Sequence, residues 1–186
     1  MADPIELRLP DPCLVVLVGA AGSGKSTFAG RHFAPDEVLS SDAFRERIAG
    51  DAADQRATGA AFSRLHRALR RRLAEGQLTV VDATSVTARD RAPLLHAAKA
   101  SGVPAMAVVM DLPQGVVLAR NAHRNGRSVP EAAVRRQLDR LATSLRPPGL
   151  AAEGFAFVTV LRDPAAVDAL QVVRDPRVPL AGSGVR

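Results

Sequence analysis

The segment LVVLVGAAGSGKSTFAGRHF (residues 14–33) joins an apolar run to a cluster of glycines, and a lysine and two hydroxyl side chains follow at once. Within it, GAAGSGKS (19–26) matches the pattern G-x-x-x-x-G-K-[ST]. Such an apolar run is typical of a strand buried on both faces, and glycines permit the tight turn that aims backbone N–H groups at an anion. We therefore predict a strand, a phosphate-binding loop and a helix, in this order.

The loop predicts a site for a nucleoside triphosphate, ATP or another NTP, together with Mg²⁺. Lys25 would reach the β and γ phosphates, and the Ser26 hydroxyl would be the metal ligand. The positive N-terminal end of the following helix adds to the attraction for phosphate. The candidate nucleotide-binding residues are Gly19, Gly22, Ser23, Gly24, Lys25, Ser26, Thr27 and, from a later segment, Arg120.

Further buried-strand patterns follow along the chain, separated by helical patterns, and this alternation predicts a parallel sheet covered on both faces. The expected fold class is α/β, a three-layer sandwich of the P-loop NTPase type with a roughly five-stranded parallel sheet and an arginine-rich lid. The expected strands lie at 13–19, 37–42, 78–83, 105–112 and 155–161.

Two of the helices are predicted from apolar stripes. Helix 60–75 carries its stripe at Phe62, Leu65, Leu69 and Leu73, and helix 130–146 carries it at Val134, Leu138, Leu141 and Leu145. We expect an N-terminal extension over 1–11, one domain over 12–161, and a C-terminal packing segment and tail over 162–186.

The composition favours an acidic partner. The 186-residue chain has a net charge of +6, and all but two of its 25 basic residues, Lys25 and Lys99, are arginines. This charge suits nucleotides or nucleic acid, although an arginine-biased genome would produce it as well. Aromatic residues make up only 3%, which argues against an extended stacking platform. With one cysteine, no disulfide or cysteine metal site is expected, and the lack of a long apolar segment predicts a cytoplasmic protein with no membrane partner.

Two carboxylates are expected at the carboxyl edge of the sheet, where open α/β sheets bind ligands. Asp42, in EVLSSDAFRER (37–47), would accept a proton from an attacking hydroxyl, and Arg45, three residues later, would hold an anionic acceptor. Alternatively, Asp42 only caps a helix. Asp82, at the end of LTVVD (78–82), would steady Mg²⁺ or its waters, or orient a basic group on the acceptor side.

Arginines gather in two further segments. RNAHRNGR (120–127) predicts a lid in which Arg120, Arg124 and Arg127 neutralise charge on the phosphates; the alternative is a solvated basic loop. Arg64, Arg67 and Arg71 lie opposite the apolar stripe of helix 60–75. They form either a solvated face or a track for a phosphate backbone.

Over about residues 12–161, the chain resembles the kinase domain of bacterial polynucleotide kinase-phosphatase. Six segments carry the resemblance, in the same order and spacing: GAAGSGKSTFAGRHF, EVLSSDAFR, DAADQRATGAAF, LTVVDATSV, DLP and RNAHRNGR. The resemblance implies transfer of the γ-phosphate of ATP or another NTP to a 5′-OH end of RNA or DNA. It also implies Asp42 as the general base, Arg45 as the ligand of the acceptor phosphate, and Gln55 near the acceptor.

The chain departs from that family in Ser85, where the family motif VDATN has asparagine, and in a thinner acidic run before Gln55. It is too short for the phosphatase and ligase modules of the related multidomain enzymes, so such repair partners would be separate chains. Two other functions remain open. One is a kinase for a small hydroxylated metabolite, nucleoside or antibiotic, and the other is a non-enzymatic NTP-binding module.

Overall fold

A five-stranded parallel sheet forms the centre of the computed structural model, which describes residues 6–49, 58–123 and 128–175. The strand order is β3-β4-β2-β5-β6, and every neighbouring pair is parallel. The strands are β2 (Leu14–Val18), β3 (Val38–Ser40), β4 (Thr79–Asp82), β5 (Ala105–Met110) and β6 (Phe157–Leu161). The expected fold class is confirmed, and each of the five expected strands is present.

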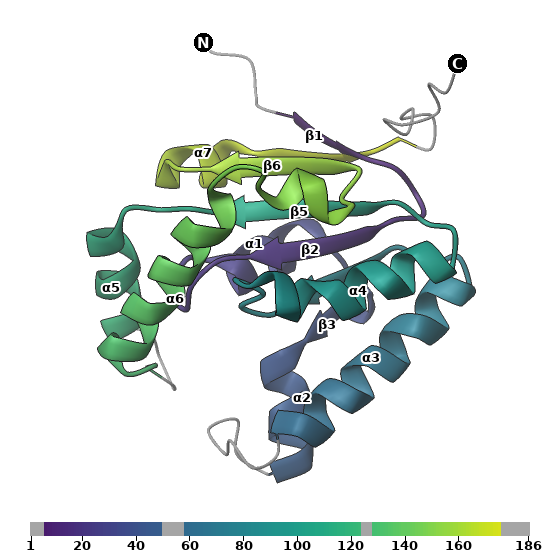
Figure 1. The fold of residues 1–186 in the computed structure, drawn as a ribbon, viewed down its shortest axis with the longest axis horizontal. Coiled ribbons are helices and arrows are strands. Elements are labelled where there is room, and N and C mark those ends of the chain that lie inside the picture. Colours follow the sequence, from purple (N-terminus) through teal and green to yellow (C-terminus); the bar gives the residue numbers. More distant parts are fainter. Residues whose placement is uncertain (1–5, 50–57, 124–127, 176–186) are drawn as a thin grey trace.

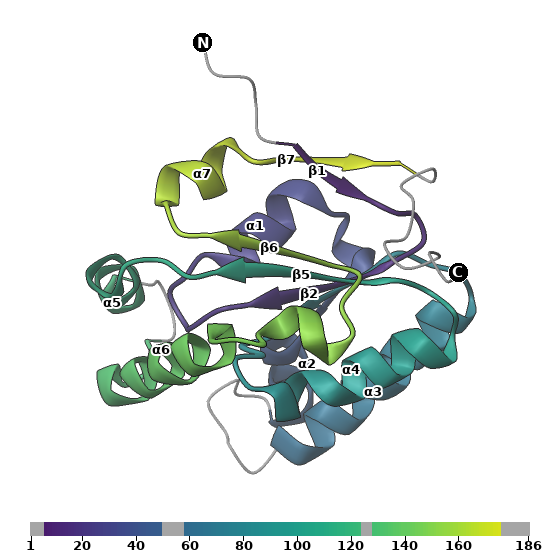
Figure 2. The same ribbon diagram turned by 45° about the horizontal axis from the view of Figure 1, so that its top comes forward.

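Helices cover both faces of this sheet (Figures 1 and 2). They are α1 (Lys25–His32), α2 (Ser41–Ala49), α3 (Thr58–Ala74), α4 (Ala88–Ala100), α5 (Gln114–Ala122), α6 (Glu131–Leu145) and α7 (Pro164–Ala169), with short 3₁₀ helices η1 (Pro35–Glu37) and η3 (Leu150–Glu153). Among these described helices, none is long and apolar enough to cross a membrane.

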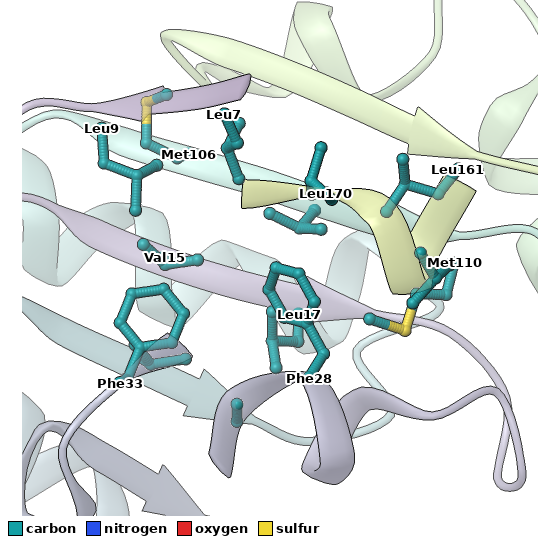
Figure 3. Close-up of a cluster of buried hydrophobic side chains, with 14 of the residues drawn as sticks. Leu7, Leu9, Val15, Leu17, Phe28, Phe33, Met106, Met110, Leu161 and Leu170 are labelled. Carbon is teal, nitrogen blue, oxygen red and sulfur yellow. The ribbon is translucent and has the colours of Figure 1, made fainter. Parts of the chain in front are cut away.

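The two hydrophobic clusters of the core lie on opposite faces of β2, because successive side chains of a strand point to opposite sides. Val15 and Leu17 belong to one cluster with Phe28 of α1, whereas Leu14 and Val16 belong to the other. Figure 3 shows that the first cluster also includes Leu7 and Leu9 from the N-terminal part of the chain and Leu170 from the C-terminal part. The second cluster contains side chains of α3, α4 and α6. The sheet is therefore sandwiched between two apolar layers, which fixes the positions of the loops at its carboxyl edge.

A second, two-stranded parallel sheet was not expected from the sequence. In it, β1 (Glu6–Leu9) pairs with β7 (Gln171–Arg174), and the two strands lie side by side above the main sheet in Figure 2. Leu9 is fully buried, and Arg174 donates to both carboxylate oxygens of Glu37 in η1 at 2.8 and 2.7 Å. The alternation of polar and apolar residues in ELRL (6–9) is itself a strand signal, but the partner strand lies more than 160 residues away and no local pattern identifies it.

The apolar stripe expected for α3 is wrong at one position. Leu65, Leu69 and Leu73 are at most 1% exposed, but Phe62 is 36% exposed. The first turns of α3 lie next to α2 rather than over the sheet (Figure 1), so the same helical face that is buried further along opens into a cleft at Phe62. The stripe of α6 is buried at Val134 and Leu141.

Candidate active site

The phosphate-binding loop connects β2 to α1 and contains glycines with positive φ values. Gly24 is the N-cap of α1 with a φ of 97°. Gly22 has a φ of 86°, and a Cβ atom there would lie 2.5 Å from the carbonyl oxygen of Val117 in α5. L-residues rarely adopt such φ values. The loop is thus held in a left-handed conformation, and it packs directly on α5.

Lys25 and Ser23 form the inner side of this loop. The Lys25 ammonium donates to the carbonyl oxygen of Ala20 at 2.8 Å and to the Ser23 hydroxyl at 3.4 Å. Ser23 is fully buried, so it supports the lysine from behind and does not line the cleft. Gly19 also lies behind the cleft, where its N–H donates to the carbonyl oxygen of Thr84 at 3.1 Å. Ser26 and Thr27 are exposed to the cleft.

Helices α5 and α6 form the second wall. A Cβ atom on Gly24 would lie 3.6 Å from Nη1 of Arg120, which places this guanidinium against the phosphate-binding loop. From α6, Arg136, Gln137 and Arg140 line the cleft. The Gln137 side-chain oxygen accepts a hydrogen bond from the backbone N–H of Ala21 at 2.8 Å.

These three residues of α6 were not predicted from the sequence, where only the apolar stripe of the helix was considered. Residues 133, 136, 137 and 140 follow the spacing i, i+3, i+4, i+7 of a second helical face. The polar face of a helix beside a phosphate-binding loop was the signal that could have found them.

The opposite wall comes from α2. Asp42 and Arg45 lie on one face of α2, as their spacing predicted; they also form an ion pair, and both line the cleft. Ser40 occupies the position before the helix, and its hydroxyl accepts from the N–H of Ala43 at 3.4 Å. The carboxylate of Asp42, whose side chain is 40% exposed, is paired with Arg45 and faces the cleft. Ser40 therefore caps the N-terminus of α2.

Asp82 lies on the floor between the two walls. It ends β4, pairs in register with Leu17 of β2 and Ser40 of β3, and is 7% exposed. The turn that follows has Ser85 in the left-handed region, with a φ of 48°. The departure from asparagine therefore falls at a backbone conformation that asparagine adopts more readily than serine.

A buried ion pair supports this turn. Arg91 of α4 is fully buried and donates to both carboxylate oxygens of Glu153 at 2.8 and 2.5 Å. It also donates to the carbonyl oxygen of Ser85 at 2.7 Å. Ser144 of α6 donates to the neighbouring Val86 carbonyl at 2.6 Å. Sequence reasoning missed this network, because Arg91 and Glu153 come from elements that are distant along the chain.

These walls enclose one cleft of about 980 Å³. Of the candidate site residues, it brings together Gly22, Gly24, Lys25, Ser26, Thr27, Asp42, Arg45, Asp82 and Arg120. Gln55, Arg124 and Arg127 lie outside the described residues. Lysine and arginine side chains outnumber aspartates along the cleft, so its field favours a polyanion.

The oxygen donors in the cleft suit a Mg²⁺ ion that is held partly by substrate phosphates, rather than a metal ion held by protein side chains alone. Across 6–49, 58–123 and 128–175, no group of three or more His, Cys, Asp or Glu side chains could hold a metal ion. Mg²⁺ commonly binds through one or two protein oxygens together with substrate phosphates. The Ser26 hydroxyl and the Asp82 carboxylate, both on the cleft, fit that donor set.

Comparison with solved structures supports the fold. A chain of the Pnkp1/Rnl/Hen1 RNA repair complex is 25% identical with a TM-score of 0.63, over 73% of this chain and 45% of that one. An unliganded sugar kinase from Janibacter sp. HTCC2649 is 23% identical with a TM-score of 0.57, over 84% and 91%. Shikimate kinase from Acinetobacter baumannii, in complex with shikimate, is 24% identical with a TM-score of 0.51, over 84% and 88%.

The match to the RNA repair complex thus spans less than half of that chain's length, whereas the two small-molecule kinases are matched over most of theirs. No curated protein matches the chain significantly. A family model described as an AAA domain matches residues 14–148, which include the phosphate-binding loop, Asp42, Asp82 and all of α6. The chain therefore belongs to this AAA-domain family and has the fold of a P-loop kinase.

Proposed function

We propose that residues 12–161 transfer the γ-phosphate of ATP, or of another NTP, to the 5′-OH end of RNA or DNA. The observation that carries the proposal is the Asp42–Arg45 ion pair, which lines the same cleft as Lys25 and Ser26. A site that only binds a nucleotide has no need for a carboxylate that accepts the proton of an alcohol.

In this reaction Asp42 accepts the proton of the acceptor hydroxyl while the hydroxyl oxygen bonds to the γ-phosphorus. The bond from that phosphorus to the bridging oxygen breaks, and the nucleoside diphosphate leaves with its electrons. Arg45 orients the Asp42 carboxylate, and its planar guanidinium suits a phosphate of the acceptor chain. When bound, Mg²⁺ would neutralise charge on the β and γ phosphates, with Ser26 and Asp82 holding it.

Arg120 lies beside Gly24, where a guanidinium neutralises charge that develops on the transferred group. We extend the same role to Arg124 and Arg127, which follow it in the chain, and place Gln55 near the acceptor. The assignments of Arg124 and Arg127 rest on the arginine-rich segment RNAHRNGR (120–127) and on the family resemblance, and that of Gln55 on the resemblance alone.

A polynucleotide acceptor is supported by the charge of the protein surface around the cleft. Arg136 and Arg140 add two cations to the wall on α6, and Arg64, Arg67 and Arg71 are exposed on α3, the helix that borders the acceptor end. Rows of arginines can neutralise successive phosphates of a strand. The likeness to a chain of an RNA repair complex agrees with this acceptor, and repair enzymes on separate chains would then be partners.

A second candidate is a kinase for a small hydroxylated metabolite. It is favoured by the length of the matches, since the chain aligns with about nine tenths of both the sugar kinase and the shikimate kinase. The acceptor's charge distinguishes the two candidates, because a polyanionic strand binds with a strong dependence on salt and a neutral alcohol does not.

The test incubates the protein with labelled ATP, Mg²⁺ and either a 5′-OH oligonucleotide or a panel of small alcohols, at 50 and 200 mM salt. We expect the oligonucleotide to be labelled, with a KM that rises steeply between the two salt concentrations. Asp42→Asn should lower transfer by at least about a hundredfold, the lower range of general-base assistance. Nucleotide binding and the far-UV circular dichroism spectrum should stay unchanged.

Asp36→Asn is the matched control, because Asp36 is an exposed aspartate in η1 that does not line the cleft. It should behave like the parent. Full activity of Asp42→Asn would place the base elsewhere, with Asp82 as the next candidate. Labelling of a small alcohol but of no oligonucleotide, at either salt concentration, would establish the second candidate instead.

A further inference from the structure

Phe62 combines two properties that rarely occur together in this chain: it is aromatic and it is exposed. The chain has six phenylalanines and no tryptophan or tyrosine. Phe28, Phe33 and Phe155 are buried in the core. Of the large hydrophobic side chains in residues 6–49, 58–123 and 128–175, Phe62 alone is exposed. Single exposed apolar residues are ordinary on protein surfaces. Phe62, however, lines the active-site cleft rather than the outer surface.

The surroundings of Phe62 form a shaped aromatic surface. The ring of His66, one turn later on α3, lies edge-on to it with the centroids 6.2 Å apart. Leu65, between them in the chain, is 1% exposed and also borders the cleft, so the α3 wall has an apolar base. Burial and the positive charge of Arg70 lower the pKa of His66, which keeps its ring uncharged at neutral pH.

This wall lies on the acceptor side of the cleft. Helix α3 packs against α2, which carries Asp42 and Arg45, and Figure 1 shows the N-terminal end of α3 beside α2. The phosphate-binding loop, Arg120 and Gln137 belong to other elements, β2–α1, α5 and α6. Phe62 therefore lies on the same side of the cleft as Asp42 and away from the phosphate-binding loop, where the acceptor of the proposed reaction would bind.

The chemistry of the wall selects a flat, uncharged ring. An exposed phenyl face next to an imidazole favours offset or edge-to-face contact with another π-system. Sugars and other polyols have no π-system to offer this pair of rings. A cation would also meet a phenyl face favourably, but the arginines of the same cleft repel it.

We propose that Phe62, together with His66, binds the nucleobase of the acceptor's 5′-terminal nucleotide by stacking. This subsite rests on the proposed 5′-hydroxyl kinase function and makes it more specific: the enzyme recognises the base next to the reacting hydroxyl as well as the phosphates that follow. Every nucleobase has a π-face, so the contact discriminates between nucleotides and base-free acceptors rather than between sequences.

The test compares two oligonucleotides that differ only in the 5′-terminal nucleotide, which carries a base in one and is an abasic tetrahydrofuran residue with the same 5′-OH in the other. Stacking on an aromatic side chain changes affinity by about 5- to 150-fold per base. We expect the parent to show a KM for the abasic strand that is higher by a factor in this range. Its kcat should be the same within about twofold, because stacking acts equally in the ground and transition states.

Phe62→Ala should raise the KM for the natural strand to that for the abasic strand and leave the latter unchanged. Phe62→Leu keeps apolar bulk without a ring and should behave like Phe62→Ala. Ser63→Ala is the matched control, an exposed neighbour on α3 that does not line the cleft, and should keep the preference. In a binding readout, 2-aminopurine at the 5′ end should be quenched by the parent and not by Phe62→Ala; without tryptophan or tyrosine the protein adds little background.

The outcomes separate the two proposals. If the parent phosphorylates both strands with the same KM, or if Phe62→Ala raises both KM values equally, the stacking subsite is wrong and the kinase function stands. If the parent phosphorylates neither strand, the proposed function itself fails and the subsite with it. Quenching of 2-aminopurine that survives in Phe62→Ala would place the base elsewhere in the cleft.

Discussion

The buried pair Arg91–Glu153 gives the most direct test of how the cleft floor is held. Glu153→Ala would leave a fully buried guanidinium facing only neutral acceptors, the Ser85 carbonyl oxygen at 2.7 Å and the Ser144 hydroxyl at 3.3 Å. Breaking a buried ion pair from one side destabilises a protein by about 3–5 kcal/mol, out of a total of about 5–15 kcal/mol. We expect a loss of that size.

The assay is urea unfolding followed by far-UV circular dichroism, since the chain has no tryptophan or tyrosine to report by fluorescence. With a slope of about 2 kcal/mol per molar urea, the midpoint should fall by roughly 1.5–2.5 M. Glu75→Ala is the matched control. It breaks the exposed Arg71–Glu75 contact at 3.8 Å and should change the free energy of unfolding by less than about 1 kcal/mol.

A second variant separates the lost pair from the lost packing. Replacing both partners, Arg91→Met with Glu153→Ala, removes the buried charge and should recover most of the stability that Glu153→Ala loses, because apolar side chains of similar volume often substitute for a buried pair. If Glu153→Ala cost no more than Glu75→Ala, water would be reaching the guanidinium, and the argument from burial would be refuted.

Two further predictions concern the nucleotide side. Lys25→Ala, and likewise Ser26→Ala, should reduce phosphotransfer to background in the labelled-ATP assay while the circular dichroism spectrum is retained; full activity in either variant would contradict the phosphate-loop assignment. Gln137→Ala removes the 2.8 Å hydrogen bond to the Ala21 N–H and should raise the KM for ATP by about fivefold, as expected for the net loss of one hydrogen bond. Asp139→Ala, on the exposed face of the same helix, is its control, and equal KM values in the two variants would exclude a positioning role for Gln137.

The nucleotide half of the site could be predicted because its residues are contiguous. A glycine loop between an apolar strand and a helix has few possible conformations, so GAAGSGKS predicted both the turn and the positions of Lys25 and Ser26. The ion pair of Asp42 and Arg45 was predictable for the same reason, since both residues lie within one helical turn.

The other half depends on tertiary contacts that no local pattern encodes. Phe62 has the same helical spacing as Leu65 and Leu69, and only the position of α3 relative to α2 decides that its ring is exposed in the cleft. Arg91 and Glu153 are 62 residues apart, and the β1–β7 pair joins the two ends of the described chain. Periodicity predicts which face of an element is apolar, but not what lies opposite that face.

The contacts of the phosphate-binding loop connect the two halves. At its start, the Gly19 N–H bonds to the Thr84 carbonyl, in the turn that Arg91 holds at Ser85; further along, the Ala21 N–H bonds to Gln137 of α6. A shift of the cleft floor or of α6 therefore moves backbone N–H groups of the loop. For this reason we expect Gln137→Ala to raise the KM for ATP, although Gln137 lies 116 residues after Ala21 in the chain. Substitution of Phe62 on α3, whose ring contacts His66 of the same helix, should act on the acceptor alone.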